Sequence, residues 1–167
     1  RNLFLRDLSC ASNNLSSIDI SKNIDLDYFD IHGNHLTSLN VTSNTKLTVL
    51  NCRYNQLTTL DASTNSNLIN FFCDNNQLTE KKKKNGRNSI LTAMDFKINP
   101  ALTCIQVDNE IYSNANWLAN KDNPTIYSND CSRITAITPP TITAVGDQIY
   151  CPQNTIKIVE DITISHD

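Results

Sequence analysis

The sequence predicts a mainly β solenoid whose short parallel strands lie on two faces. The first observation behind this prediction is a period of 21 positions, which five sets of residues share between Leu5 and Leu78. A fixed period of about 20 to 50 residues indicates repeated units that stack in one direction. The five sets are Leu5, Leu26, Leu47 and Leu68; Leu8, Phe29, Leu50 and Phe71; Cys10, Ile31, Cys52 and Cys73; Asn13, Asn34, Asn55 and Asn76; and Leu15, Leu36, Leu57 and Leu78.

The second observation is that each unit repeats its own pattern after ten positions. Residues 15–23 follow the pattern of residues 5–13, and the same echo occurs in the next two units. The third observation is that no unit sustains the apolar spacing of three and four that a helix needs. We therefore expect two extended segments and two Asn corners in each coil, with neighbouring coils about 4.8 Å apart in two parallel sheets.

The repeated apolar positions are expected to point inward, where each fully buried side chain contributes about 1.5–3 kcal/mol. One coil cannot cover its own apolar edge, so stability must come from stacking on its neighbours. The asparagines are expected at the corners, because Asn tolerates left-handed backbone and its amide can bond to backbone groups of the next coil. A ladder of such amides would pair corner backbone groups that are otherwise buried and unsatisfied.

The repeat L-x-x-L-x-(C/I)-x-x-N-x-L resembles the leucine-rich repeat, and in particular a short bacterial variety whose repeat has this same length. The resemblance covers roughly residues 2–108 and predicts a leucine-rich-repeat solenoid over residues 1–108. Asn2 lies 21 positions before Asn23, and no charged-then-apolar leader precedes it. We therefore expect a piece of a longer protein from which a signal peptide is missing.

The regular pattern breaks after Leu78, where Lys81–Lys84 replace the next apolar position. It resumes at Met94-Asp95-Phe96, with Asn99, Leu102, Ile105 and Val107. Leu102 follows Leu68 by 34 positions instead of 21, so the pattern implies 13 inserted positions. Asn85-Gly86 is a strong turn signal. We predict a hairpin-like excursion over residues 79–92 that projects into solvent. Its basic tip is either simply solvated or contacts an acidic partner.

The segments after the last repeat look like the C-terminal cap of leucine-rich repeat proteins exported by Bacteroidetes-type bacteria. The resemblance implies a cap over residues 109–133 in which Cys104 pairs with Cys131, and a disulfide indicates an oxidising compartment. A cap is needed because the last coil would otherwise expose its apolar edge. The candidates to cover that edge are Trp117, Ile111 and Tyr112, with a short helical turn over residues 114–118.

Beyond the cap, residues 134–140 include Pro139-Pro140 and are expected to form a stiff linker. Residues 141–167 alternate like strands and resemble the opening of an immunoglobulin- or cadherin-like module, cut before a sandwich of about 100 residues could form. Whether Cys151 pairs is left open by the sequence.

The remaining cysteines, Cys10, Cys52 and Cys73, share an inward position with Ile31 and are interpreted as small hydrophobes. No C-x-x-C spacing suggests a metal site, and no cofactor motif occurs. His32 is expected near Ser9, so a hydrolytic group is conceivable. Nothing activates that serine and an open sheet excludes no water, so we predict that the protein is not an enzyme.

The outward positions of the first sheet form three predicted rows with varied side chains. Aromatic residues and arginine are favoured at contact hot spots, so this face is the predicted binding surface. The rows are Asp7, Tyr28, Val49 and Asn70; Ser9, Asp30, Asn51 and Phe72; and Ala11, His32, Arg53 and Asp74. The predicted binding residues are Tyr28, Asp30, His32, Asn51, Arg53, Tyr54, Phe72 and Asp74.

The second sheet is expected to present small polar rows and to act as a solvated wall. Its acidic row could collect calcium and its Ser/Thr rows could order water at ice, but the carboxylates more simply bond to corner amides. The rows are Ser17, Ser38 and Thr59; Asp19, Asn40, Asp61 and Asp95; and Ser21, Thr42, Ser63 and Lys97.

The 167-residue chain has a net charge of −3 and a pI near 5.5, which argues against nucleic acid or an anionic membrane as the main partner. No run of about 18 apolar residues could span a membrane. We predict an extracellular, non-catalytic recognition module on the surface of a bacterium that binds a protein or glycan. The alternative is a structural spacer or accessory subunit of a larger outer-membrane surface assembly.

Overall fold

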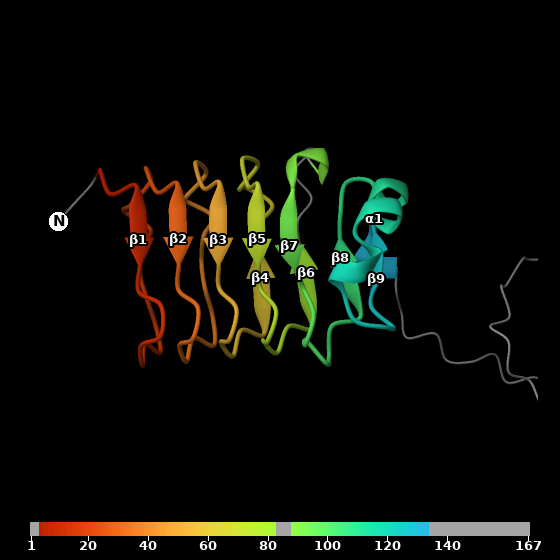
Figure 1. Ribbon diagram of the computed structural model, residues 1–167, viewed down its shortest axis with the longest axis horizontal. Helices are drawn as coiled ribbons and strands as arrows, with labels where there is room; N and C mark the ends of the chain where they lie inside the picture. The colour runs from red at the N-terminus through yellow and green to blue at the C-terminus, as the bar shows by residue number, and fades with distance from the viewer. Residues whose placement is uncertain (1–3, 83–87, 134–167) are drawn as a thin grey trace, which may run out of the picture. The chain divides into compact units, whose positions relative to one another are not determined.

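The computed structural model describes residues 4–82 and 88–133, which form parallel strands stacked as a solenoid in two sheets (Figure 1). The predicted fold class, a mainly β leucine-rich-repeat solenoid with a C-terminal disulfide, is confirmed. The first sheet has the order β1-β2-β3-β5-β7 and the second the order β4-β6-β8-β9. The strands of the first sheet are β1 (Asp7–Ser9), β2 (Tyr28–Asp30), β3 (Val49–Asn51), β5 (Asn70–Phe72) and β7 (Ala93–Asp95). Those of the second are β4 (Thr59–Asp61), β6 (Glu80–Lys82), β8 (Cys104–Gln106) and β9 (Ile126–Ser128).

The period of the sequence sets the register of the first sheet. Leu8 pairs with Phe29, which pairs with Leu50, and the ladder continues through Phe71 to Met94. Because side chains alternate across a strand, this register sends every repeated apolar residue into the interior. The predicted core is observed, since the repeated inward leucines and phenylalanines of coils two to four are buried.

The second sheet is shorter than predicted. Residues 17–19 and 38–40 are not strands, so hydrogen-bonded pairing on this face begins only at β4. The backbone bond from Thr58 N to Thr37 O measures 3.4 Å, whereas the bond from Thr79 N to Thr58 O measures 3.0 Å. The backbones on this face therefore approach each other closely enough for good hydrogen bonds only in the later coils.

The asparagine ladder forms as predicted, although its amides reach the preceding coil. Asn55 donates from Nδ2 to Ile31 O at 3.0 Å and accepts at Oδ1 from Leu36 N at 3.0 Å. The same arrangement recurs at Asn34, Asn76 and, in its main bonds, at Asn99, which belongs to the pattern that resumes after the excursion. Each asparagine thus closes a corner that backbone groups alone leave unpaired.

The left-handed backbone expected of these asparagines lies one residue earlier. The residues with positive φ are Ser12, Gly33, Tyr54, Asn75 and Ile98. The expectation was wrong because the chain reverses at the residue before the asparagine, and the asparagine side chain then points into the stack. Tyr54 and Ile98, with φ of 53° each, adopt this conformation although it is unfavourable for large side chains.

The predicted excursion over residues 79–92 is too wide. Glu80–Lys82 form β6, whose central residue Lys81 pairs in register between Leu60 and Ile105. Asn70 pairs with Ala93, 23 positions later instead of 21, so the first sheet absorbs an insertion of two and not of thirteen. Parallel pairing uses backbone groups, so a rung of the ladder survives without a leucine. Residues 83–87, which include the predicted Asn-Gly turn, lie outside the described residues.

Because of this register, two residues lie on a different face from the one predicted. Asp95 pairs with Phe72 in the first sheet, and Lys97 follows two residues later. Both were predicted on the second sheet because the insertion was assigned the wrong length.

The cap joins the second sheet through β9, which pairs with β8. Between these strands lie α1 (Glu110–Asn116), which begins earlier than the predicted turn, and the 3-10 helix η2 (Leu118–Asn120). Trp117 is 4% exposed and meets the rings of Tyr112 and Tyr127 edge-on at 5.8 and 5.9 Å. Trp117 and Tyr112 therefore pack against the core as predicted. Ile111 does not, because it lies on the outer side of α1 and is 80% exposed.

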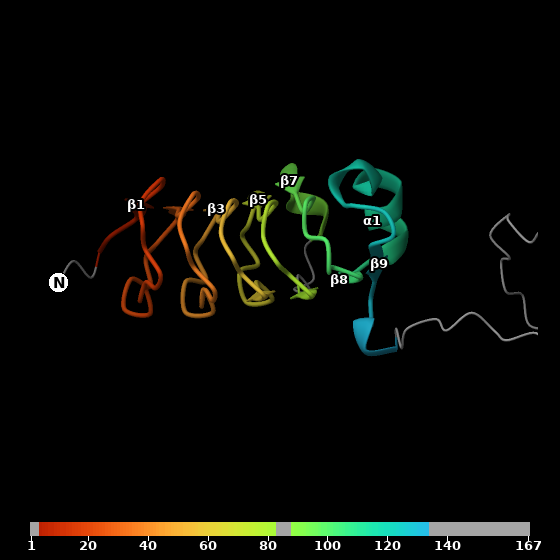
Figure 2. The same cartoon turned by 90° about the horizontal axis from the view of Figure 1, so that it is seen from below.

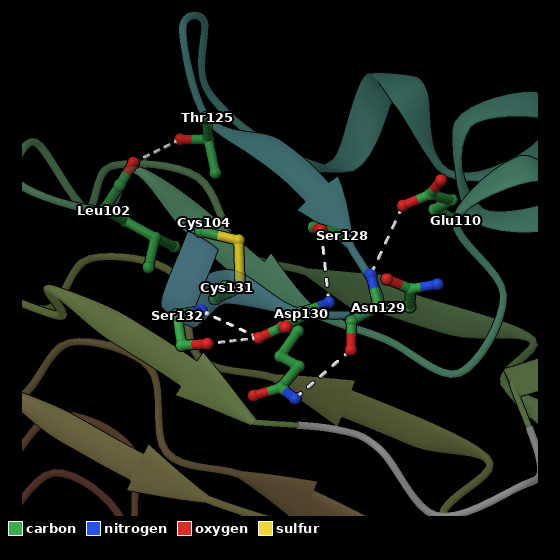
Figure 3. The surroundings of a disulfide bond; sticks show 10 residues. Leu102, Cys104, Glu110, Thr125, Ser128, Asn129, Asp130, Cys131 and Ser132 are labelled. Carbon is green, nitrogen blue, oxygen red and sulfur yellow. Dashed lines mark hydrogen bonds between the residues drawn. A yellow bond between two sulfur atoms is a disulfide. The ribbon is translucent and has the colours of Figure 1, made fainter. Parts of the chain in front are cut away.

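The predicted disulfide joins Cys104 on β8 to Cys131, which begins the 3-10 helix η3 (Cys131–Arg133), with 5.9 Å between Cα atoms (Figure 3). Thr125 adds a bond from Oγ1 to Leu102 O at 2.6 Å, so two links tie the cap to the last coil near the start of β8. Cys52 and Cys73 are fully buried and Cys10 is partly buried, as expected for residues in a hydrophobic position. The linker expected over 134–140, the module over 141–167 and Cys151 lie outside the described residues.

The asparagine ladder can be tested at Asn55. We expect Asn55→Ala to lower the free energy of unfolding by about 2–4 kcal/mol, because Leu36 N–H loses its partner inside the stack and Ile31 C=O loses one of its two donors. The matched control is Asn13→Ala. Asn13 is exposed and bonds only to Cys10 O and Ala11 O of its own coil, so a loss below about 1 kcal/mol is expected. Equal losses in urea denaturation would contradict this account of the corners.

The buried phenol of the cap predicts a pH dependence. Tyr127 donates to Trp117 O at 2.9 Å, and burial raises the pKa of Tyr127 above its usual 10.0. Above about pH 10 the unfolded chain therefore loses this proton first, and stability that is complete below that pH falls as the pH rises. Urea denaturation at about pH 8 and pH 11 should show a smaller alkaline loss for Tyr127→Phe than for the original chain. An identical alkaline loss in the two proteins would rule out this role for Tyr127.

Candidate functional site

The outward side of the first sheet, with the corner that follows it, is named the variable face (Figure 2). Its rows run along the solenoid in register because the strands pair in register. Backbone bonds such as Cys52 N to Phe72 O and Tyr54 N to Asp74 O continue the alignment beyond the strands. The rows are Asp7, Tyr28, Val49, Asn70 and Ala93; Ser9, Asp30, Asn51, Phe72 and Asp95; and Ala11, His32, Arg53, Asp74 and Lys97.

Arg53 is the centre of one cluster on this face. Its guanidinium carbon lies 4.7 Å from the centroid of the Phe72 ring, and its Nε lies 3.1 Å from Asp74 Oδ1. These two groups are close enough for an ion pair, but their orientation does not meet the geometry of a hydrogen bond. The other oxygen of Asp74 accepts from Asn75 Nδ2 at 2.8 Å. The arginine is thus held by an aromatic ring and a nearly buried carboxylate, which reduces the entropy it would lose on binding a partner.

His32 and Asp30 form a second cluster. Asp30 Oδ1 lies 2.7 Å from His32 Nδ1 and accepts from the His32 backbone N at 3.1 Å. Tyr28 donates its hydroxyl to Asp30 Oδ2 at 3.4 Å, and Asn51 Nδ2 lies 3.4 Å from His32 Nδ1. Desolvation first, and then the charge of Asp30, raise the pKa of Tyr28. These contacts orient side chains on two neighbouring rungs.

The structure separates the predicted binding residues into two kinds. Asp30 and Asp74 are 8% and 6% exposed, so they position their neighbours and offer little surface to a partner. Tyr28 and Tyr54 are 36% and 56% exposed and project from the face and its corner. His32, Asn51, Arg53 and Phe72 are intermediate in exposure.

The sequence interpretation missed Asp95 and Lys97, which extend two of the rows, and Ile98, which is 59% exposed at the corner. The signal that could have located them is Asn99, which lies 23 positions after Asn76 and continues the corner ladder. An alignment on asparagines would have given the correct insertion length, because these amides make the corner bonds in every coil.

Among the described residues, no serine is placed to act as a nucleophile with His32 as its base. A nucleophilic serine must lie within hydrogen-bond reach of its base, and no hydrogen bond joins Ser9 to His32 in the described part of the chain. Of three clefts lined by described residues, none includes His32. Within residues 4–82 and 88–133, no three His, Cys, Asp or Glu side chains gather as a metal site.

The predicted polar rows run along the second face over the first three coils, without Asp95 and Lys97, and of their members only Thr59 and Asp61 lie in a strand, β4. Asp19 and Asp61 each accept at Oδ1 from the backbone N two residues later, at 2.9 Å. This backbone bond from Ser21 is the main cause that lowers the pKa of Asp19. The carboxylates therefore bond to corner amides, as interpreted from the sequence.

Comparison with known proteins places the fold in context. No protein-family model and no curated protein matches the chain. Among solved structures, the functional domain of InlJ from Listeria monocytogenes, which includes a cysteine ladder, is 30% identical with a TM-score of 0.53. The match covers 64% of this chain and 27% of the InlJ chain.

The chain is similar to a leucine-rich repeat protein. It spans about a quarter of the InlJ chain, so the match supports the repeat architecture and not a shared activity. A row of cysteines also occurs here, where Cys10, Cys52 and Cys73 occupy one inward position that Ile31 interrupts. No helix in the described ranges is long and apolar enough to cross a bilayer.

The Arg53 cluster can be tested by a double-mutant cycle. The side chains of Arg53 and Asp74 are 32% and 9% exposed, so Arg53→Ala leaves a nearly buried charge without its ion-pair partner. We expect this substitution to lower the free energy of unfolding by about 1–3 kcal/mol. Asp74→Asn in the Arg53→Ala background should recover part of that loss in urea denaturation. A double variant less stable than Arg53→Ala alone would contradict the coupling.

Proposed function

We propose that this chain is an extracellular, non-catalytic recognition module that binds a protein or glycan partner on a bacterial cell surface through the variable face. The observation that carries the proposal is the contrast between the two sheets. The variable face combines aromatic, cationic and anionic side chains, whereas the outward rows of the second face hold only Ser, Thr, Asn and Asp over the first three coils. The few residues that dominate the binding energy of protein interfaces are enriched in tryptophan, tyrosine and arginine, so the variable face is the better binding surface.

The proposal is supported by side chains on the variable face that neighbouring groups hold in position. Arg53 is held by Phe72 and Asp74, and His32 is held by Asp30. A partner that docks on prearranged side chains loses less conformational entropy than one that must order them. The exposed phenols of Tyr28 and Tyr54 then offer apolar rings and polar tips at the same surface.

An extracellular location is supported by the disulfide between Cys104 and Cys131, since such bonds persist in oxidising compartments. The similarity to the InlJ domain supports the repeat architecture on which this surface is built. We assign no catalytic residue, metal or cofactor to this function.

The test compares two variants that change different faces. Tyr28→Ala with Tyr54→Asn removes both exposed rings, and asparagine tolerates the positive φ at position 54. The control, Ser38→Ala with Thr59→Ala, also carries two substitutions, and both lie on the second face. Each protein is immobilised, bacterial surface extracts are passed over it, and retained proteins and glycans are quantified.

We expect the tyrosine variant to capture at least about tenfold less partner than the original chain. Each aromatic anchor that a partner buries contributes about 1–2 kcal/mol. The control variant should retain the same amount as the original chain. Equal capture by all three proteins would refute the proposed face. Circular dichroism of each variant verifies that the solenoid is intact.

A further inference from the structure

The corner at Asn99 is closed differently from the corners before it. At Asn34, Asn55 and Asn76, the backbone N donates to a backbone O of the next coil, at 3.2 Å in each case. At Asn99 the backbone N donates instead to Oδ2 of the Asp122 side chain, at 3.1 Å. A carboxylate thus takes the place of the neutral carbonyl that closes the earlier corners, and it brings a negative charge that the corner bond itself does not require.

A groove of about 460 Å³ lies beside this carboxylate, and its volume is within the range of about 300–1,000 Å³ that ligand sites have. Ile98 and Pro100 line it from the corner, and Pro124 lines it from the segment that leads into β9. All three are exposed, so the groove offers apolar surface that a ligand can cover. None of the lining residues was among those predicted to bind from the sequence.

Ile98 is an unusual residue for its position. Its φ of 53° is unfavourable for a β-branched side chain, and the equivalent corners of two earlier coils hold Gly33 and Asn75, which tolerate such backbone. The side chain is 59% exposed, so burial in the core does not account for it. An apolar side chain kept in this conformation at a surface is consistent with a contact made there.

The polar side chains around the groove are largely used within the fold. Asn99 accepts at Oδ1 from Leu78 N and donates from Nδ2 to Cys73 O, and Thr125 donates to Leu102 O (Figure 3). Asp122 is the one charged residue in the described lining. Among the described residues, no hydrogen bond reaches its Oδ1. That oxygen is therefore available to a cationic donor.

Apolar walls beside a single carboxylate suit a long aliphatic side chain with a positive end. A lysine can lay its methylene stem along apolar surface while its ammonium group stays at a polar edge. The neighbouring Lys97 and Lys121 are not among the lining residues, and Lys121 Nζ lies 5.9 Å from the centroid of the Tyr127 ring. The charge of Asp122 therefore faces the groove without a cation of its own in the described lining.

The corner bond also distinguishes lysine from arginine. A guanidinium group binds a carboxylate best through two parallel hydrogen bonds, which use both carboxylate oxygens. An ammonium group is a compact point charge and needs only one. Because Asn99 N already occupies Oδ2, one oxygen remains. We propose that the groove between Ile98 and Asp122 binds a lysine side chain of a partner protein, whose ammonium group Asp122 Oδ1 accepts. This site does not require that the variable face have a partner.

The test uses peptides that differ in one side chain. The whole isotope-labelled chain is titrated at low ionic strength with acetyl-Gly-Lys-Gly-amide up to about 50 mM, since one ion pair at a surface binds weakly. The same peptide with arginine or with uncharged norleucine is titrated in parallel. Amide chemical shifts of Ile98, Asn99 and Asn123 locate the binding. We expect a saturable change at these amides with lysine, at least about twofold weaker binding with arginine, and no saturable change with norleucine.

The matched pair of variants is Asp122→Asn and Glu110→Gln. Asp122→Asn keeps an oxygen for Asn99 N and removes the charge, so it separates binding from the closure of the corner. Glu110 likewise accepts from a backbone N in the cap, that of Asn129 at 3.4 Å, but it does not line the groove. We expect Asp122→Asn to weaken binding of the lysine peptide at least about threefold, and Glu110→Gln to change it less than about 1.5-fold. Thermal unfolding of both variants verifies that the cap is folded.

Four outcomes would overturn the proposal. They are no saturable change at the groove amides with the lysine peptide, equally tight binding of the norleucine peptide, arginine binding as tight as lysine or tighter, and equal weakening by the two variants. Neither variant touches Tyr28 or Tyr54. Failure here and failure of the variable face are therefore separate results.

Discussion

The hydrogen bonds of the buried corner asparagines are the interaction on which the rest of the structure depends. A coil of this kind turns sharply, and its corner carbonyl and amide groups lie inside the stack, away from water. Asn34, Asn55 and Asn76 pair these groups across neighbouring coils. Without them, each turn would bury unsatisfied backbone groups at a cost of about 1–3 kcal/mol each, and the apolar side chains could not stack at their close spacing.

The same ladder separates structural from functional positions. Inward residues and corner asparagines must repeat, because each contacts its equivalent in the next coil. Outward residues on the first sheet meet only solvent and one another, so they can differ from rung to rung. The Arg53 and His32 clusters arise from this freedom, because a fixed register places unlike side chains directly beside each other. A regular scaffold thus presents an irregular surface.

The cap meets a different physical requirement. The last coil offers an apolar edge that cannot be covered by another identical unit, and Trp117, Tyr112 and Tyr127 cover it with edge-to-face rings. The disulfide and β9 attach the cap to the second sheet, whereas Asn120 attaches it to β7 by two hydrogen bonds. The cap therefore closes the two sheets by different means.

The sequence by itself determined the solenoid, its register over four coils, the buried leucine rows and the rows of the variable face. These follow from the period alone, since residues one period apart must lie on adjacent rungs. The disulfide followed from a resemblance and not from spacing. Tertiary structure decided the rung at Lys81, the short insertion before Ala93 and the groove beside Asp122. Backbone pairing tolerates an atypical side chain, and a groove depends on how separate segments meet, so neither is visible in apolar periodicity.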